Sequence, residues 1–186
     1  GSIVIKGKYI LDIIRKLDSE FINIEIIDDH KIVVFTENSE FNLNGIEARE
    51  YPEINLDLSP DFVSMEIDDF RSMILQTNYA CSLDEARVVL TGVNIKIDGE
   101  NLEFSATDSY RLALRKKLLT NSVNNGADII IPSKNLSELL KLLSSGADEL
   151  IEMHLFSNKV IFKFNNILFQ SRLISGTYPN TKNLIP

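Results

Sequence analysis

The chain has 186 residues, is 44% hydrophobic and carries a formal net charge of −8, so it can bury one or two sizeable cores. This acidic balance argues against a general nucleic-acid coat, and any DNA-facing surface must be a local basic stripe. The single cysteine cannot build an internal disulfide framework. No apolar run reaches the ~18 residues of a membrane span and no signal peptide opens the chain, so we expect a cytoplasmic protein.

The first 57 residues predict a short strand, a helix and three further strands. The helix has its apolar residues at i, i+3, i+4 and i+7, namely at Ile10, Ile13, Ile14 and Leu17. The stretch Asp28–His30 falls between two predicted strands. Its side chains could ligate a metal, but its position favours a hairpin turn.

A weaker copy of this order follows the connector Pro52–Pro60. Its helix carries the stripe Phe70, Met73, Ile74 and Thr77, and three strands are predicted after it. The last two strands form a hairpin. We expect its tip to present Asp108–Arg111, with Leu112 and Leu114 packed beneath, although a polar tip without function also fits.

The last third of the chain repeats the first. Residues 129–143 align with residues 3–17 at an offset of 126 (129 − 3), and their stripe is Leu136, Leu139, Leu140 and Leu143. Each copy therefore predicts a β-α-β-β-β half-domain, and two half-domains make a domain. The predicted fold is α+β, with helices on one concave side of antiparallel sheets. Residues 1–57 form half of one domain and residues 58–186 form a whole domain.

Two of the predicted helices carry a plus-minus-plus stripe opposite their apolar face. Its members are Lys8, Asp12 and Arg15 in the first helix and Lys134, Glu138 and Lys141 in the last. An ordinary solvated face with local charge pairs explains this pattern. The alternative is a surface that contacts DNA loosely. The middle helix has Asp68, Ser72 and Leu75 at these positions, which weakens that alternative there.

Nothing in the chain predicts catalysis. His30 and His154 belong to no nucleophile-base-acid arrangement, and no phosphate-binding or dinucleotide-binding glycine motif is present. Cys81 has no basic neighbour in sequence, so we expect a packing thiol. We expect no catalytic residue, no cofactor and no metal.

Three ordered motifs carry a resemblance to a known family. The stretch ATDSYRLA (106–113) resembles the A-T-D-(G/S)-H-R-L-A signature of the bacterial sliding clamp, the beta subunit of DNA polymerase III. RVVLTG (87–92) and RLISGTYPNTKNLIP (172–186) support it. The chain departs from the pattern at Tyr110, where the family usually has His, and at Asn183, where many members have Arg.

This resemblance implies a non-catalytic processivity factor of bacterial DNA replication. It implies the DNA clamp fold, with this chain covering the second half of the first domain and all of the second. In the family, a homodimeric ring encircles double-stranded DNA without sequence specificity. It tethers the DNA polymerase III alpha subunit, the clamp loader and other clamp-binding peptides in an apolar pocket.

Carried over to this chain, the resemblance assigns three sets of residues. The expected DNA-facing residues are Lys8, Arg15, Lys134 and Lys141, and the expected ring interface uses Phe41 and Leu43. The expected partner-peptide pocket consists of Leu90, Thr107, Ser109, Tyr110, Arg111, Leu112, Pro179, Asn183 and Leu184.

Two other classes stay open on the residues alone. One is an enzyme on an α+β scaffold, which clustered titratable groups in a deep pocket would support. The other is a β-rich interaction module unrelated to DNA, in which the leucines of the expected pocket are plain core.

Overall fold

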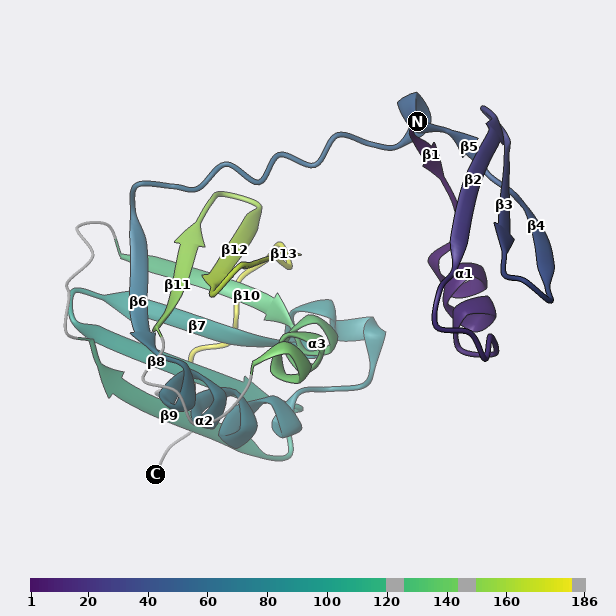
Figure 1. The fold of residues 1–186 in the computed structure, drawn as a ribbon. Helices are drawn as coiled ribbons and strands as arrows, with labels where there is room; N and C mark the ends of the chain where they lie inside the picture. The colour runs from purple at the N-terminus through teal and green to yellow at the C-terminus, as the bar shows by residue number, and fades with distance from the viewer. Residues whose placement is uncertain (120–125, 144–149, 182–186) are drawn as a thin grey trace. The chain divides into compact units, whose positions relative to one another are not determined.

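The structure is a computed structural model that describes residues 1–119, 126–143 and 150–181. The chain divides into two compact units, Gly1–Asn55 and Leu56–Pro186 (Figure 1).

The first unit contains one helix and two small antiparallel sheets. Strands β2, β3 and β4 form the larger sheet in that order, and β1 pairs with β5. The elements are β1 (Ile3–Val4), α1 (Gly7–Ile14), β2 (Asn23–Asp28), β3 (Lys31–Phe35), β4 (Glu40–Asn44), β5 (Ile46–Glu47) and the 3-10 helix η1 (Ala48–Glu50).

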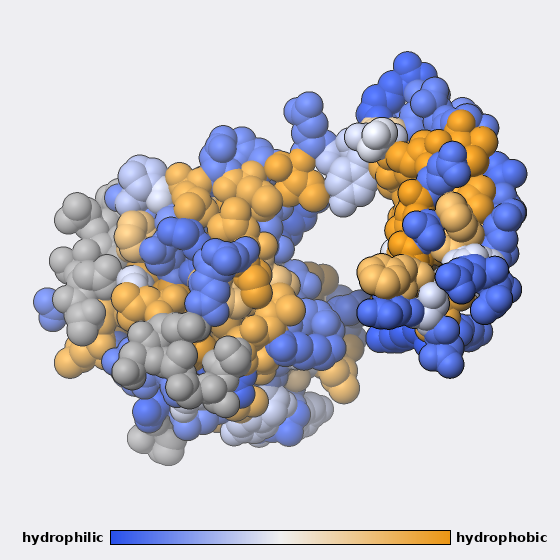
Figure 2. All heavy atoms as spheres, viewed as in Figure 1, coloured by the Kyte–Doolittle hydropathy of each residue, from blue (hydrophilic) through white to orange (hydrophobic). Residues whose placement is uncertain are grey.

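Burial in this unit is sparse. Ile32 and Val34 of β3 are its only fully buried apolar residues, whereas α1 buries none and Ile14 remains 41% exposed. All six residues of β2 are exposed. Figure 2 shows the resulting hydrophobic surface on the visible side of this unit. The predicted apolar stripe of the first helix is therefore present but only partly covered, since Ile10, Ile13 and Leu17 are half-buried and Ile14 is exposed.

In its described residues, the second unit contains the helices α2 and α3, the 3-10 segments η2 and η3, and two four-stranded antiparallel sheets, ordered β10-β7-β8-β9 and β13-β12-β11-β6. Its first half comprises β6 (Phe62–Glu66), α2 (Ile67–Thr77), η2 (Asn78–Ala80), η3 (Glu85–Thr91, kinked at Arg87), β7 (Gly92–Asp98), β8 (Asn101–Thr107) and β9 (Leu112–Leu118). Its second half comprises β10 (Ala127–Pro132), α3 (Ser133–Leu142), β11 (Leu150–Leu155), β12 (Lys159–Phe164) and β13 (Ile167–Arg172).

The two halves of this unit exchange their first strands. β6 of the first half pairs with β11 of the second, and β10 of the second half pairs with β7 of the first. At the end of the β10–β7 ladder, Pro132 lies opposite Gly92. A Cβ on Gly92 would lie 2.6 Å from the carbonyl oxygen of Ile131, so the close strand approach requires glycine there. Neither sheet is complete without the other half.

The main core lies where α2 and α3 meet the inner faces of both sheets. The whole predicted stripe of α2 is buried, and Phe70 packs against Phe104 and Phe162 with ring centroids 5.8 and 5.4 Å away. In the third copy Leu136, Leu139 and Leu143 are buried and Leu140 is half-buried. The element order therefore confirms the predicted β-α-β-β-β repeats, and the α+β class is confirmed.

One detail of the hairpin differs from the prediction. Its second strand begins at Leu112, and Ala113 is the residue that enters the main core, because it pairs with the buried Ala106 on β8. Leu112 and Leu114 are half-buried on the opposite face of the sheet. Small Ala113 fits the core-facing register position, whereas the sequence pattern assigned that face to the larger leucines.

The stretch Asp28–His30 forms the predicted turn, in which the backbone N–H of His30 donates a 2.8 Å hydrogen bond to Asp28 Oδ1. Within the described residues, no group of His, Cys, Asp and Glu could hold a metal ion. None of the helices in the described part of the chain has both the length and the apolar character needed to cross a membrane.

Candidate functional site

The turn between β8 and β9 is held rigid by its own side chains. Asp108 Oδ1 accepts 3.0 Å hydrogen bonds from the backbone N–H groups of Tyr110 and Arg111, and Asp108 Oδ2 accepts from Arg111 Nε at 2.9 Å. Thr107 Oγ1 donates to the Arg111 carbonyl at 2.6 Å. Ser109 takes the left-handed conformation with φ of 79°. The turn is therefore pre-formed, and Tyr110 projects from it fully into solvent.

The charge of Asp108 is stabilised by this turn. Hydrogen bonds from the backbone of Tyr110 and Arg111, and then the Arg111 guanidinium, lower the pKa of its carboxyl. The Arg111 guanidinium also lies 5.8 Å from the centre of the Tyr79 ring. At neutral pH the carboxylate therefore remains an acceptor, and both charged groups of the turn are oriented.

A second wall faces this turn and is formed by the segment between α2 and β7. The side chain of Asp84 accepts a 2.9 Å hydrogen bond from the N–H of Ala86, which caps η3. Arg87 then reaches across to donate a 3.0 Å hydrogen bond to Ser109 Oγ. The backbone N–H of Ser82 donates to the Leu90 carbonyl at 2.8 Å. These contacts fix the segment against the hairpin tip.

Between the two walls lies a cleft of about 580 Å³. Leu83 and Tyr110, 99% and 97% exposed, stand at its edge, while Cys81 and Leu90 are buried at its base. The residues that line it are Cys81, Ser82, Leu83, Asp84, Arg87, Leu90, Asp108, Ser109, Tyr110 and Arg111. An open cleft with an apolar base, an exposed apolar rim and two oriented arginines suits an extended peptide segment with an apolar anchor.

The base of the cleft is kept uncharged. Burial raises the pKa of the Cys81 thiol to about 11, although a hydrogen bond with Ser133 acts in the opposite direction. At neutral pH Cys81 therefore presents a neutral sulfur to the cleft, as the packing role predicted from the sequence requires.

A small second core supports the cleft from behind. It consists of Leu90, Ile130 and Tyr178, all buried. The Tyr178 hydroxyl accepts a 3.0 Å hydrogen bond from the backbone N–H of Thr107, and burial raises its pKa to about 12. The segment after β13 is thereby attached to the strand that carries the turn.

The structure brings together part of the predicted pocket. Leu90, Ser109, Tyr110 and Arg111 line the cleft. Thr107 and Leu112 lie at the strand ends behind the turn, with Thr107 buried and Leu112 half-buried, and Pro179 is exposed beside Tyr178. Asn183 and Leu184 lie outside the described residues.

The pocket predicted from the sequence did not include the wall formed by Cys81–Asp84. It also did not include Arg87 and Asp108, which line the cleft. The segment Cys81–Asp84 is an irregular stretch between the 3-10 segments η2 and η3, without helical or strand periodicity. A signal does exist in the sequence: the first and third copies pass from helix to second strand without a comparable polar insert.

The predicted DNA-facing residues are all exposed. Lys8 lies in α1 and Arg15 immediately follows it, whereas Lys134 and Lys141 lie in α3 of the other unit. Lys141 Nζ pairs with Glu138 at 2.8 Å, as the charge stripe suggests. The predicted ring-interface residues Phe41 and Leu43 are half-buried on the edge strand β4.

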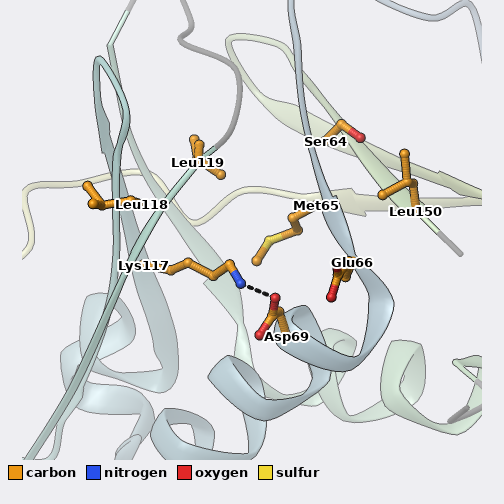
Figure 3. Close-up of a pocket in the computed structure, with 8 residues that line it drawn as sticks. All are labelled: Ser64, Met65, Glu66, Asp69, Lys117, Leu118, Leu119 and Leu150. Atoms are coloured by element: carbon orange, nitrogen blue, oxygen red, sulfur yellow. Dashed lines mark hydrogen bonds and ion pairs between the residues drawn. The ribbon is translucent and has the colours of Figure 1, made fainter. Parts of the chain in front are cut away.

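A further hollow of about 260 Å³ lies where β6 and the start of α2 approach the end of β9. Figure 3 shows Lys117 pointing across it to an ion pair with Asp69, beside the apolar side chains of Met65 and Leu119. Its base is thus occupied by a charge pair that the protein satisfies itself, and we assign it no ligand.

Comparisons with known proteins agree with the fold and the motifs. Residues 64–180 match the family described as "DNA polymerase III beta subunit, central domain", and residues 1–57 match "DNA polymerase III beta subunit, N-terminal domain". The chain is 38% identical to the beta sliding clamp of Bacillus subtilis (strain 168) over 186 residues, and 40% identical to that of Staphylococcus epidermidis (strain ATCC 12228 / FDA PCI 1200). Each alignment covers 100% of this chain and 49% of the relative, so the chain spans about half the length of these curated proteins.

Solved structures give the same result. The fold superposes on the crystal structure of the DNA polymerase sliding clamp from Bacillus subtilis with a TM-score of 0.90 at 38% identity, covering 100% of this chain and 49% of that one. For the beta subunit from DNA polymerase of Streptococcus pyogenes the TM-score is 0.87 at 29% identity, with 100% and 50% covered. Because a family match spans more than half of its residues and the fold agrees, this chain belongs to the DNA polymerase III beta subunit family.

Proposed function

We propose that this chain is part of a sliding clamp, a processivity factor of the bacterial replicative DNA polymerase. In this proposal it contributes to a homodimeric ring around double-stranded DNA and tethers polymerase, clamp loader and repair proteins through the cleft at the β8–β9 turn. It acts in the cytoplasm, by binding and topology, and catalyses no reaction itself. The observation that carries the proposal is the pre-formed turn, whose family-signature residues line an apolar-based cleft.

The cleft is the proposed site for partner peptides. Tyr110 and Leu83 are the two exposed apolar side chains at its rim, and neither supports the fold. In this proposal Tyr110 and Leu83 contact an apolar side chain of the partner peptide and hold it over Leu90, at the buried base of the cleft. Partner peptides therefore bury an apolar side chain there, while Arg87 and Arg111 offer hydrogen bonds to the peptide backbone or to an acidic side chain.

A peptide titration tests this proposal. A fluorescent peptide carrying the clamp-binding segment of the DNA polymerase III alpha subunit should bind the chain, and Tyr110→Ala or Leu83→Ala should each weaken binding by about 1 kcal/mol or more. Tyr51→Ala is the matched control, because Tyr51 is an exposed aromatic in the other unit. Equal affinity in all four proteins, with unchanged circular dichroism, contradicts the assignment of the cleft.

The DNA contact is proposed for the exposed cations Lys8, Arg15, Lys134 and Lys141. A surface with few cations, one of them already paired with a carboxylate, suits loose contact better than tight, steeply salt-dependent binding. In the full-length ring, replacing all four with Glu should impair loading on DNA and processive synthesis. Stability should change by about 0.5 kcal/mol or less per site because these positions are exposed. Normal loading and processivity would remove this role.

The ring interface is proposed for the edge strand β4, with Phe41 and Leu43. Its outer edge has no strand partner among the described residues, and these two side chains alternate with exposed polar ones. In the full-length protein, Phe41→Asp with Leu43→Asp should shift the dimer towards monomer in sedimentation, and an unchanged dimer would exclude this strand.

A further inference from the structure

One segment lies behind both walls of the cleft. It comprises residues 173–178, which directly follow β13 and which we call the strap. The N–H of Leu173 donates a 3.0 Å hydrogen bond to the Asn158 carbonyl, just before β12. The N–H of Ile174 then donates to the Ile130 carbonyl on β10 at 2.8 Å. The strap is therefore attached to the body of the second unit before it reaches the cleft.

The end of the strap is bonded to the strand that carries the turn. The ladder between β7 and β8 ends with the pair Asn94 and Ser105, two residues before Thr107. At Thr107 the backbone N–H donates a 3.0 Å hydrogen bond to the Tyr178 hydroxyl, and both residues are buried. The hydroxyl thus supplies an acceptor at a point where the pairing with β7 has ended. The turn begins at the next residue, so this bond fixes the start of the turn.

The middle of the strap lies against the opposite wall. Gly176 has a φ of 134°, and a Cβ placed on it would lie 2.6 Å from Val89 Cγ1. Val89 is the neighbour of Leu90, which forms the base of the cleft, and it packs against the small second core that contains Leu90 and Tyr178. Both the backbone conformation and the close contact with this wall therefore require glycine at position 176.

The two walls also contact one another at the rim, through the exposed hydrogen bond from Arg87 to Ser109. An exposed hydrogen bond contributes little net stability, because it replaces hydrogen bonds to water. The contacts behind the cleft are of another kind, since Thr107, Leu90 and Tyr178 are all buried. The separation of the walls therefore depends mainly on the strap.

We propose that Tyr178 and Gly176 are positioning residues of the cleft. Tyr178 fixes the turn through Thr107 and Gly176 fixes the opposite wall through Val89, so the strap sets the separation of the walls that a partner peptide enters. This inference rests on the proposed peptide-binding function of the cleft. Walls that are held in place before binding lower the ordering cost of binding. By linkage, a bound peptide must stabilise the docked strap by the same factor by which the strap strengthens peptide binding.

Hydrogen exchange of the full chain without peptide, followed by NMR, tests the positioning directly. Tyr178→Phe keeps the ring and removes only the hydroxyl that accepts from Thr107. The amide of Thr107 should then exchange about tenfold faster or more, because it loses a buried hydrogen bond. The amide resonances of Tyr110 and Arg111 should shift with it, because the start of the turn is no longer fixed.

Gly176→Ala tests the opposite wall. The added methyl group meets Val89 and occupies a backbone conformation that favours glycine. The amide of Ser82, which donates to the Leu90 carbonyl within this wall, should exchange faster than in the parent chain. If Gly176→Ala fails to fold, Val89→Ala replaces it, because this change opens a gap at the same contact and should also speed exchange at Ser82.

A titration with the fluorescent peptide of the DNA polymerase III alpha subunit tests the link to binding. Tyr178→Phe and Gly176→Ala should each raise the Kd about two- to thirtyfold, although both positions lie outside the described residues that line the cleft. Ile151→Val is the control, because it removes one methylene from the main core on β11 and costs a similar amount of stability. Its affinity should equal that of the parent, since nearly all molecules stay folded at this cost.

The outcomes separate a positioning role from a purely structural one. In the parent chain, saturating peptide should slow exchange of the Thr107 amide by the factor that Tyr178→Phe adds to the Kd. If Tyr178→Phe and Gly176→Ala match Ile151→Val in both Kd and exchange of the wall amides, the proposal is overturned. A parent chain that does not bind the peptide would instead contradict the proposed function, and exchange of the wall amides would then decide alone whether the strap positions the walls.

Discussion

The two units contain the same repeat and bury it to very different extents. In the second unit two repeats face one another, and α2 buries five side chains in the shared core. In the first unit the single described repeat has the same apolar stripe, yet α1 buries none and β2 is exposed along its whole length. An apolar stripe thus becomes core only when a second repeat covers it and supplies a strand to its sheet.

The first way to break this comparison is to remove one side chain of the apolar stripe from the helix of each unit. Phe70→Ala in α2 should cost about 3–5 kcal/mol, because the ring is fully buried between Phe104 and Phe162. Ile14→Ala in α1 should cost about 1 kcal/mol or less, since the side chain is substantially exposed. Denaturant unfolding, with hydrogen exchange to assign each transition to a unit, measures both. Equal costs would show that the first unit is covered in solution.

Cysteine alkylation gives a second test of the difference in burial. The pKa of Cys81 is raised from an ordinary value of 9.0 to about 11, so at pH 8 it holds about a hundredfold less thiolate than a free cysteine. Iodoacetamide should react at least that much more slowly with Cys81 than with a cysteine placed at exposed Ile14 in a Cys81→Ala background. The Cys81 rate should continue to rise above pH 9, and a plateau there would contradict the buried environment.

A third test weakens the link behind the cleft. Tyr178→Phe removes the hydroxyl that accepts from the backbone N–H of Thr107 and leaves that buried donor without its partner. The expected loss of stability of the second unit is about 1–2 kcal/mol. Thermal unfolding followed by circular dichroism measures it. The control is Tyr9→Phe in the first unit, where the side chain is half exposed and no loss is expected.

The smallest expected effect comes from removing one lysine from the charge stripe of α1 or of α3 and comparing the loss of stability. Lys141→Ala removes an exposed ion pair with Glu138 and should cost about 0.3–0.5 kcal/mol. Lys8→Ala should cost close to nothing, because Lys8 makes no ion pair within the described part of the chain. Urea titrations at low and high salt distinguish the two variants. At low salt, Lys141→Ala should be less stable than the parent, and at high salt this difference in stability should disappear because salt screens the ion pair with Glu138.

The local elements were predictable because each depends on nearby residues. The stripes of all three helices follow from i, i+3, i+4, i+7 spacing, and the turn at Asp28–His30 follows from turn-forming side chains between two strands. The register of the hairpin was not predictable from alternation, because Ala113 and Leu114 are both apolar and either could face the core. Pairing with Ala106 decides it.

The exchange of first strands and the cleft depend on distant contacts, and the sequence carries little signal for either. β6 could have paired with its own half, and nothing local excludes that. Half of the cleft comes from Cys81–Arg87, which has neither helical nor strand periodicity. The strand pattern predicted that Asp108–Arg111 lie at the tip of the hairpin, but only the resemblance to a family signature assigned Ser109, Tyr110 and Arg111 to a pocket. Hydrogen bonds such as Arg87 to Ser109 join segments 22 residues apart.

The exchange of first strands has a consequence for how the protein is made. Phe62 of β6 lies opposite His154 of β11, which is 92 residues later in the chain (154 − 62). At about 5–20 residues per second, a ribosome needs about 5–20 s to deliver that partner. Meanwhile β6 has left the exit tunnel with both edges open, and the sheet of β7, β8 and β9 also waits for β10. The second unit can therefore complete its sheets only late in synthesis, and until then its unpaired strand edges are open to pairing with other chains.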